Sequence, residues 1–257
     1  MISPLASIHP EAKLAGNVTV EAFAVVEADV EIGEGAWIAS GAYILAGTRM
    51  GKNCRVFHGA VVGGIPQDLK FEGEYSQVII GDGCTIRECA TINRGTKAFG
   101  KTILGRECLV MANAHVAHDC QVGDHVILVN NVALAGHVEI GDWSIIGGLS
   151  AVHQFVKIGA HVMVGGGSLV RKDIPPYITV AREPLSYEGV NALGLRRRSF
   201  KNARIEEIHH AYRLVYQSCF NTSQAISQIE LEVAESPERS EILRFLLASD
   251  RGIVKNT

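Results

Sequence analysis

The chain has 257 residues, a net charge of −3 and a hydrophobic fraction of 47%. These values fit a packed globular protein with room for one large and one smaller domain, and the slight negative charge disfavours general nucleic-acid binding. No apolar stretch reaches the roughly 18 residues that a membrane-spanning helix needs, and the first residues lack the basic and apolar regions of a secretory signal.

A six-residue repeat dominates the first two thirds of the sequence. From Ile8 to Val170 a large aliphatic residue returns at every sixth position in one frame, with a small or β-branched residue two positions earlier. A period of six fits neither an amphipathic helix nor a simple hairpin sheet, and it is typical of a parallel β-helix. Three hexads make one triangular coil, so residue i is expected to stack on residue i+18. The sequence therefore predicts an all-β solenoid with an aliphatic interior.

Two segments leave the repeat, which is interrupted only at Asp68, Glu74 and Ala98. Residues 66–77 replace two hexads but keep the frame, and residues 96–101 form a shorter interruption. Each is predicted to be a loop extruded from an intact coil. A long loop without structure of its own is more often functional than accidental, and protection of a sheet edge is the alternative.

Four of the six cysteines occupy the inward, small-residue position of the hexad: Cys54, Cys84, Cys108 and Cys120. Buried, reduced thiols that pack as small apolar groups are expected there, in preference to disulfides or a metal site. The chain has no C-x-x-C pair. Together with the missing secretory signal, this usage indicates a cytoplasmic protein.

A second domain is expected after the repeat. The pair Pro175-Pro176 is predicted to end the β-helix, because proline cannot donate to the next strand. Helices are predicted from the apolar spacing and from the cap and first-turn proline at Ser236-Pro237; their expected ranges are 204–217, 223–234 and 237–248. The domains are therefore placed at residues 1–187, the β-helix, and 188–257, a small helical domain.

Polar residues that interrupt the β-helix faces indicate the chemistry. Four histidines cluster after the loops: His115, His118, His137 and His153. The 18-residue rule stacks Gly136 and then Gln154 on His118, and it stacks His137 on Asp119. An imidazole beside a carboxylate is a suitable general base at neutral pH, and a glycine N–H one coil away can donate to an oxyanion. This column suits acyl transfer to a hydroxyl group.

Two other interpretations remain open for the histidines. They can be solvated surface residues, or three of them on neighbouring coils of a trimeric β-helix can bind zinc, as in the γ-class carbonic anhydrases. The acid beside His118 and the long polar loop favour a larger substrate over zinc chemistry. The arginine run 196–198 suits a diphosphate or an acidic partner, and an exposed helix start is its alternative.

Long ungapped segments give the chain a family resemblance. They are QDLKFEGE (67–74), NAHVAHDCQVG (113–123), NNVALAGHVEIGD (130–142), IIGGLSAVHQFVKIGAHVMVGGGS (145–168), DIPPY (173–177) and GVNALGLRRRSF (189–200). In these segments the chain closely resembles the acyl-carrier-protein–UDP-N-acetylglucosamine O-acyltransferases of lipid A biosynthesis, and the resemblance covers nearly its whole length.

The resemblance implies a left-handed β-helix, a homotrimer with active sites between subunits, and no cofactor or metal. The implied reaction moves a 3-hydroxyacyl chain from the phosphopantetheine of acyl carrier protein to the glucosamine 3-hydroxyl of UDP-N-acetylglucosamine. The implied catalytic residues are His118 as general base, Asp119 as its partner and Gly136 as oxyanion donor. The implied substrate-binding residues are Asp68, Lys70, His115, His137, His153, Gln154, Asn191, Arg197 and Arg198. Gly166 and Met163 match the acyl-chain groove.

Three positions depart from the family pattern. Asn93 stands where the family has a histidine, Pro184 where a histidine often bounds the acyl groove, and Leu193 where a glutamate is common near the nucleotide. The alternatives are another hexapeptide-repeat acyltransferase, such as the N-acyltransferase of the same pathway or a coenzyme A-dependent acetyltransferase, and a non-enzymatic solenoid. An N-acyltransferase would have an additional N-terminal domain, and a structural or ice-binding solenoid would need a flat, regular face.

Overall fold

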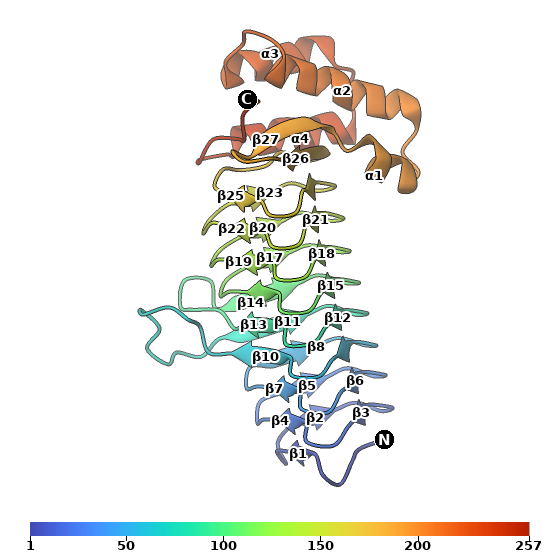
Figure 1. Cartoon of the computed structure of the whole chain (residues 1–257), viewed down its shortest axis with the longest axis vertical. Helices are drawn as coiled ribbons and strands as arrows, with labels where there is room; N and C mark the ends of the chain where they lie inside the picture. Colours follow the sequence, from blue (N-terminus) through green and yellow to red (C-terminus); the bar gives the residue numbers. More distant parts are fainter. Residues whose placement is uncertain (257) are drawn as a thin grey trace.

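The computed structural model describes residues 1–256 and consists of a triangular β-helix that carries a group of helices at its C-terminal end (Figure 1). Each coil passes once over each of three parallel sheets, here called faces 1, 2 and 3 in the order in which the chain crosses them. The three turns of a coil are named by the faces that they join. This architecture confirms the predicted all-β solenoid followed by helices.

Most strands are only two residues long, because the chain turns a corner at every hexad. Face 1 contains β1 (Ser7–Ile8), β4 (Val25–Val26), β7 (Tyr43–Ile44), β10 (Val61–Gly64), β13 (Thr91–Asn93), β16 (His115–Val116), β19 (Ala133–Leu134), β22 (Ala151–Val152) and β25 (Leu169–Val170). Face 2 contains β2 (Lys13–Leu14), β5 (Glu31–Ile32), β8 (Thr48–Met50), β11 (Gln77–Ile80), β14 (Lys101–Leu104), β17 (Gln121–Val122), β20 (Glu139–Ile140) and β23 (Lys157–Ile158). Face 3 contains β3 (Thr19–Val20), β6 (Trp37–Ile38), β9 (Arg55–Val56), β12 (Thr85–Ile86), β15 (Leu109–Val110), β18 (Ile127–Leu128), β21 (Ile145–Ile146), β24 (Met163–Val164), β26 (Ile178–Ala181) and β27 (Ser186–Val190).

The strand register confirms the 18-residue stacking rule. Val26 pairs with Ile44, and Val116 pairs with Leu134. Across the first interruption Val62 pairs instead with Ile92, and across the second Ile80 pairs with Leu104. The step across the first interruption equals one coil plus two hexads, and the step across the second equals one coil plus one hexad. Both interruptions are therefore loops extruded from intact coils, as the unchanged frame predicted.

The interior is a continuous column of aliphatic side chains. The second residue of almost every two-residue strand is buried, and the small residues that precede it fill the corners. Cys54, Cys84, Cys108 and Cys120 are buried free thiols in this column, as predicted. Each coil shields the apolar side chains of its neighbours from water, so stability comes from stacking coil upon coil.

The C-terminal end differs from the prediction in one respect. The pair Pro175-Pro176 does not end the β-helix: it lies in a turn between faces 2 and 3, and β26 then continues face 3 beside β24. Proline is tolerated there because a corner residue donates no ladder hydrogen bond. The antiparallel β27 follows and crosses the expected boundary between residues 187 and 188.

Four helices close this end: α1 (Ala192–Arg197), α2 (Asn202–Tyr216), α3 (Thr222–Glu232) and α4 (Pro237–Leu247). The last three match the predicted ranges within two residues, whereas α1 was not predicted. Ser236 caps α4 by accepting the backbone N–H of Arg239, and Pro237 occupies the first turn, as the sequence predicted. Among the described residues, no helix is long and apolar enough to cross a membrane.

Candidate active site

Three successive turns between faces 1 and 2 form the candidate site. The first two are the extruded loops, 65–76 between β10 and β11 and 94–100 between β13 and β14. The third is the turn that holds His118 and Asp119, between β16 and β17. His118 points away from the coil interior, as predicted, yet it is only 7% exposed. Both loops emerge from the same corner as His118, so the insertions that interrupt the repeat lie beside the candidate base.

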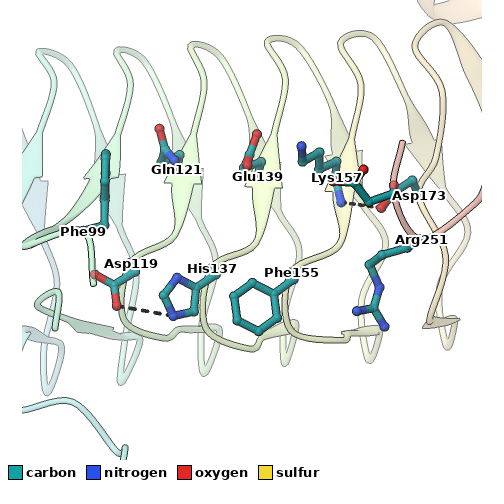
Figure 2. Close-up of a pocket in the computed structure, with 10 residues that line it drawn as sticks. Phe99, Asp119, Gln121, His137, Glu139, Phe155, Lys157, Asp173 and Arg251 are labelled. Carbon is teal, nitrogen blue, oxygen red and sulfur yellow. Dashed lines mark hydrogen bonds and ion pairs between the residues drawn. The ribbon is translucent and has the colours of Figure 1, made fainter. Parts of the chain in front are cut away.

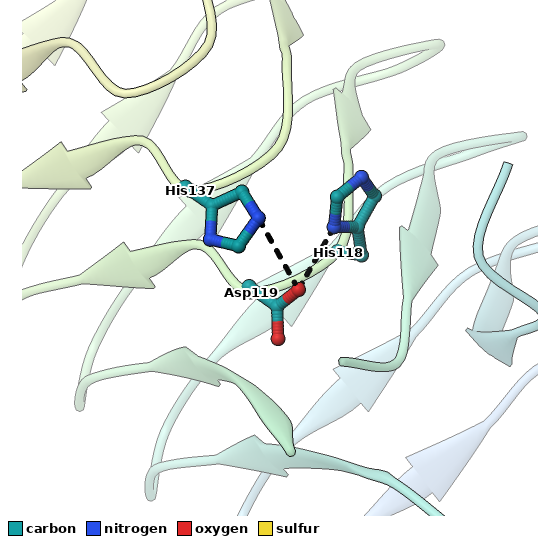
Figure 3. Close-up of side chains that lie close together, drawn as sticks. All are labelled: His118, Asp119 and His137. Atoms are coloured by element: carbon teal, nitrogen blue, oxygen red, sulfur yellow. Dashed lines mark hydrogen bonds and ion pairs between the residues drawn. The ribbon is translucent and has the colours of Figure 1, made fainter. Parts of the chain in front are cut away.

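His118 and Asp119 form a hydrogen-bonded pair (Figure 3). The Nδ1 atom of His118 lies 2.9 Å from Oδ2 of Asp119. The same oxygen lies 3.6 Å from Nε2 of His137. Because a carboxylate only accepts hydrogen bonds, Nδ1 of His118 carries the ring proton and Nε2 is left as the basic atom. Asp68, on the long loop, places Oδ2 3.9 Å from that Nε2.

Thr96 holds the carboxylate in place, a role that the sequence did not suggest. Its backbone N–H donates to Oδ1 of Asp119 at 2.9 Å, and its hydroxyl donates to Oδ2 at 2.6 Å. The hydroxyl also accepts the N–H of Ala98 at 3.3 Å, which fixes the direction of its own proton. Both Thr96 and Asp119 are buried. Thr96 is the first residue of the segment that interrupts the repeat. This position was the one feature of the sequence that could have pointed to a role for Thr96 in the site.

Replacing Thr96 with valine is expected to lower kcat with little change in KM, because the carboxylate that orients His118 loses a buried hydrogen bond. A hydrogen bond to a charged group contributes about 1.5–3 kcal/mol, which corresponds to roughly ten- to a hundredfold in rate. Steady-state kinetics measures kcat and KM separately. Thr96→Ser should restore most of the rate, and Thr19→Val, on face 3, serves as the control. Equal rates for the valine variant and the wild type would remove Thr96 from the site.

Gly136 lies directly against the imidazole of His118. A Cβ atom at Gly136 would fall 2.4 Å from Cε1 and 2.6 Å from Nε2 of that ring, closer than any side chain can approach. The neighbouring amides of Ala135 and His137 donate to backbone carbonyls, but among the described residues no backbone hydrogen bond uses the Gly136 N–H. Glycine is therefore needed for the ring to lie there, and its amide remains available to a bound oxyanion.

An elongated cavity of about 430 Å³ begins at Asp119 and runs along this corner (Figure 2). His137 and Phe155 form part of its wall and stack with ring centroids 4.6 Å apart. Burial lowers the pKa of His137 from 6.5, and the charge of Asp119 opposes this shift only in part. Burial also lowers the pKa of His115. Both rings are therefore neutral at pH 7 and suited to hydrogen bonding with a polar substrate.

The structure brings several predicted residues together at this corner. His115 precedes His118 on β16 and hydrogen-bonds to Thr91 through Nδ1 at 2.7 Å. His153 and Gln154 lie at the same corner two coils beyond His118, because β16, β19 and β22 stack in register. Lys70 is exposed on the long loop, where its backbone N–H donates to Asp68.

Five other predicted residues lie elsewhere on the same chain. Asn191 caps α1 and donates to the carbonyl of His161, at the corner between faces 2 and 3. Arg198 donates to the carbonyl of Trp143 at that same corner, and Arg197 beside it is exposed. Met163 lies on β24 of face 3, and Gly166 follows at the corner between faces 3 and 1. Within one chain, the predicted site residues therefore lie at three different corners of the β-helix: His118 between faces 1 and 2, Arg198 between faces 2 and 3, and Gly166 between faces 3 and 1.

The three residues that depart from the family pattern lie at different places in the structure. Asn93 is buried on β13, and its side-chain amide donates to the carbonyl of Ile65 at 2.7 Å, so it anchors the start of the long loop. Leu193 is 61% exposed on α1. Pro184 lies in the exposed turn between β26 and β27.

His118, Asp119 and His137 also form a set of potential metal ligands. One ligand atom from each lies within 4.8 Å of the other two. Oδ2 of Asp119 is already an acceptor for Thr96 and His118, so a bound cation would have to displace part of this network. This set contains two histidines and an aspartate rather than the three histidines of the zinc interpretation, and it coincides with the candidate base.

Comparisons with known protein sequences identify related acyltransferases over nearly the whole chain. The second domain of UDP N-acetylglucosamine O-acyltransferase matches residues 173–254, and the bacterial transferase hexapeptide (six repeats) matches residues 29–64 and 101–136. The acyl-[acyl-carrier-protein]–UDP-N-acetylglucosamine O-acyltransferase of Anaeromyxobacter sp. (strain Fw109-5) is 40% identical over 82% of this chain and 83% of its own length. The enzyme of the same name from Thermodesulfovibrio yellowstonii is 37% identical over 99% of both chains.

Solved structures that resemble this chain are also UDP-N-acetylglucosamine acyltransferases. The UDP-N-acetylglucosamine acyltransferase of Bacteroides fragilis 9343 is 49% identical, with a TM-score of 0.97 and coverage of 99% of this chain and 100% of that one. The enzyme of Francisella novicida also superimposes with a TM-score of 0.97 at 36% identity, covering 100% of this chain and 94% of that one. The chain therefore has the left-handed parallel β-helix of these acyltransferases, and it belongs to the acyl-carrier-protein–UDP-N-acetylglucosamine O-acyltransferase family of lipid A biosynthesis.

Proposed function

We propose that this enzyme transfers a 3-hydroxyacyl chain from acyl carrier protein to the glucosamine 3-hydroxyl of UDP-N-acetylglucosamine, with His118 as general base. Family membership supports the two substrates. The placement of His118 supports the mechanism: Nδ1 is bonded to Asp119, and the ring lies against Gly136, whose N–H makes no backbone hydrogen bond within residues 1–256. We place the reaction in the cytoplasm, consistent with the four buried cysteines that form no disulfide.

The proposed chemistry needs only these groups. Nε2 of His118 removes the proton from the sugar hydroxyl as its oxygen attacks the thioester carbonyl carbon. The Gly136 N–H donates to the oxyanion of the tetrahedral intermediate. The carbon–sulfur bond then breaks, and the leaving thiolate takes the proton from the imidazolium. Asp119 keeps the ring in the required tautomer throughout, because Thr96 prevents the carboxylate from turning.

We further propose that the active unit is a homotrimer with sites between subunits. Near the C-terminal end, face 3 turns Leu109, Ile127 and Ile145 outward, and face 1 turns Ala133, Ala151 and Leu169 outward. Face 2 turns polar side chains outward in the same coils. Packing face 3 of one subunit on face 1 of the next buries the apolar faces. The His118 corner of one subunit then meets the Arg198 corner of its neighbour.

Mixed trimers provide the test of this arrangement. In a trimer that combines His118→Ala and Arg198→Ala subunits, one interface of three keeps both native residues, so about a third of wild-type activity should return. Differently tagged subunits allow the mixed species to be purified, and each variant alone sets the baseline. If each site lay within one subunit, the mixed trimers would be as inactive as the single variants.

The acyl chain is proposed to run along the interface past Met163 and Gly166. Gly166 is exposed, and an added Cβ would lie 3.2 Å from the Gly148 carbonyl oxygen, so a larger side chain there must project away from the coil. Because Gly166 has no side chain to block the groove, the wild type is expected to prefer long 3-hydroxyacyl chains. Gly166→Met should shift this preference to shorter chains, since the added side chain occupies space in which each buried methylene contributes about 0.8 kcal/mol. Rates across a donor series measure this shift. Gly16→Met, in open space on the first coil, is the control; an unchanged optimum for Gly166→Met would exclude Gly166 from the groove.

A further inference from the structure

The corner that holds His118 ends in a cluster of cations. Arg171 and Lys172 follow β25 in the turn that lies three coils beyond His118, because β16, β19, β22 and β25 stack in register. At about 4.8 Å per coil, the cluster lies about 14 Å from the candidate base. Arg251 joins these two residues from the C-terminal segment 249–254, and the Nζ atom of Lys172 donates to its carbonyl at 2.6 Å.

Segment 249–254 is fixed to the β-helix by its backbone. The N–H of Asp173 donates to the Gly252 carbonyl at 3.1 Å, and the N–H of Val254 donates to the Asp173 carbonyl at 2.9 Å. Ser249 adds a bond from its hydroxyl to the Asp173 carboxylate at 2.7 Å. None of these bonds uses the side chain of Arg251. That side chain reaches toward the corner, and its guanidinium follows Asp119, His137 and Phe155 in the same row (Figure 2).

The guanidinium of Arg251 has donors to spare. Its Nε is buried without a hydrogen-bond partner, and among the described residues its guanidinium has one side-chain contact, from Nη2 to Nδ1 of His153 at 3.3 Å. The same Nδ1 lies 3.0 Å from the carbonyl oxygen of Gln154. If Nδ1 carries a proton, it donates to this carbonyl and cannot accept a hydrogen bond from Arg251. Within residues 1–256, no Asp or Glu side chain forms an ion pair with any of the three cations of the cluster.

The cavity connects Arg251 of this cluster to Asp119 at the catalytic corner. Its wall includes Phe155, between His137 and Arg251, and Phe99, at the Asp119 end; these side chains are 51% and 41% exposed (Figure 2). Glu139 lines its middle, and Asp173 and Asp250 line the Arg251 end together with Lys157. The Asp173 carboxylate already accepts hydrogen bonds from Ser249 and from the backbone of Lys157, whereas the guanidinium of Arg251 keeps free donors for an anion. A ligand that fits has a phosphate at the Arg251 end, a slender arm along the aromatic wall and a reactive carbonyl at the Asp119 end, beside His118.

We infer that Arg251, assisted by Lys172, binds the phosphodiester of the phosphopantetheine arm on the acyl donor. This inference rests on the proposed function, which requires a thioester beside His118. Guanidinium groups bind phosphate through paired, charge-assisted hydrogen bonds. The diphosphate of the sugar nucleotide is a weaker candidate, because the arginines proposed to bind it, Arg197 and Arg198, lie at a different corner.

Two small donors that differ only in the phosphate provide the test. Acyl-4′-phosphopantetheine and acyl-pantetheine are compared on the wild type, on Arg251→Gln and on Arg182→Gln, an exposed arginine of the β26–β27 turn. We expect Arg251→Gln to lower kcat/KM about tenfold or more for the phosphorylated donor, with no effect on acyl-pantetheine. Arg182→Gln should behave as the wild type with both donors.

Three results would overturn the inference. One is an equal loss with both donors, the second is a rise in KM for UDP-N-acetylglucosamine alone, and the third is a defect seen only when acyl carrier protein delivers the chain. Calorimetric titration of phosphopantetheine, with pantetheine as reference, tests the subsite without turnover. Tighter binding of the phosphorylated compound should be lost in Arg251→Gln. Wild-type enzyme that transfers no acyl chain would instead refute the proposed function, whatever this titration shows.

Discussion

Alanine in place of His118 is expected to lower kcat by at least roughly 10²–10⁴, because general-base catalysis contributes a factor of that size. The base must be Nε2 of this ring, since Nδ1 is bonded to Asp119. KM should change little, because the substrates are bound mainly by other residues. Steady-state kinetics with acyl carrier protein as donor measures both quantities.

His9→Ala, on the exposed first coil, provides the control for this variant. Thermal unfolding and the oligomeric state should remain close to wild type, because His118 lies outside the aliphatic column that stabilises the coils. A His118→Ala enzyme that keeps near-wild-type turnover would exclude this residue as the base and leave the chemistry to another group at the corner.

Alanine in place of Gly136 is expected to lower kcat about a hundredfold or more. The added Cβ would lie 2.4 Å from the imidazole of His118, so the ring, the turn or both must move. A misplacement of about 1 Å can reduce the rate by roughly 10², and loss of one oxyanion donor reduces it by roughly 10²–10³. The same substitution therefore disturbs the base and the oxyanion site together.

Gly16→Ala is the matched control, because its Cβ would meet nothing within 4 Å. A crystal structure of Gly136→Ala should show the His118 ring displaced from the amide of residue 136. If Gly136→Ala retained wild-type kcat, neither the contact with the ring nor the amide would matter for turnover.

The hexapeptide repeat predicts the parts of the site that follow from stacking. Because the 18-residue coil fixes the register, the repeat alone stacks Gly136 on His118 and His137 on Asp119, and the contacts confirm both. The position of a residue within the coil also identifies its corner. The separation of Gly166 from His118 on one chain therefore follows from the same register.

The rest depends on backbone that the repeat does not determine. Thr96 reaches Asp119 only through the conformation of the loop at 94–100, which has no periodic pattern. Asp68 of the long loop likewise approaches His118 to 3.9 Å, whereas hexad position alone predicts an outward, solvated side chain. The prediction that Pro175-Pro176 ends the β-helix was wrong because proline is excluded from strand interiors and not from corners.

Product analysis with metal-depleted enzyme tests the central proposal most directly. Chelator-treated wild type is given 3-hydroxyacyl carrier proteins of several lengths, together with acetyl coenzyme A and UDP-N-acetylglucosamine, and the products are identified by mass spectrometry and NMR. We expect one 3-hydroxyacyl group esterified to the glucosamine 3-hydroxyl, formed at the rate of untreated enzyme. Acylation at another position, acetyl transfer from coenzyme A, or activity that returns only when zinc is added would contradict the proposed chemistry of His118, Asp119 and Gly136.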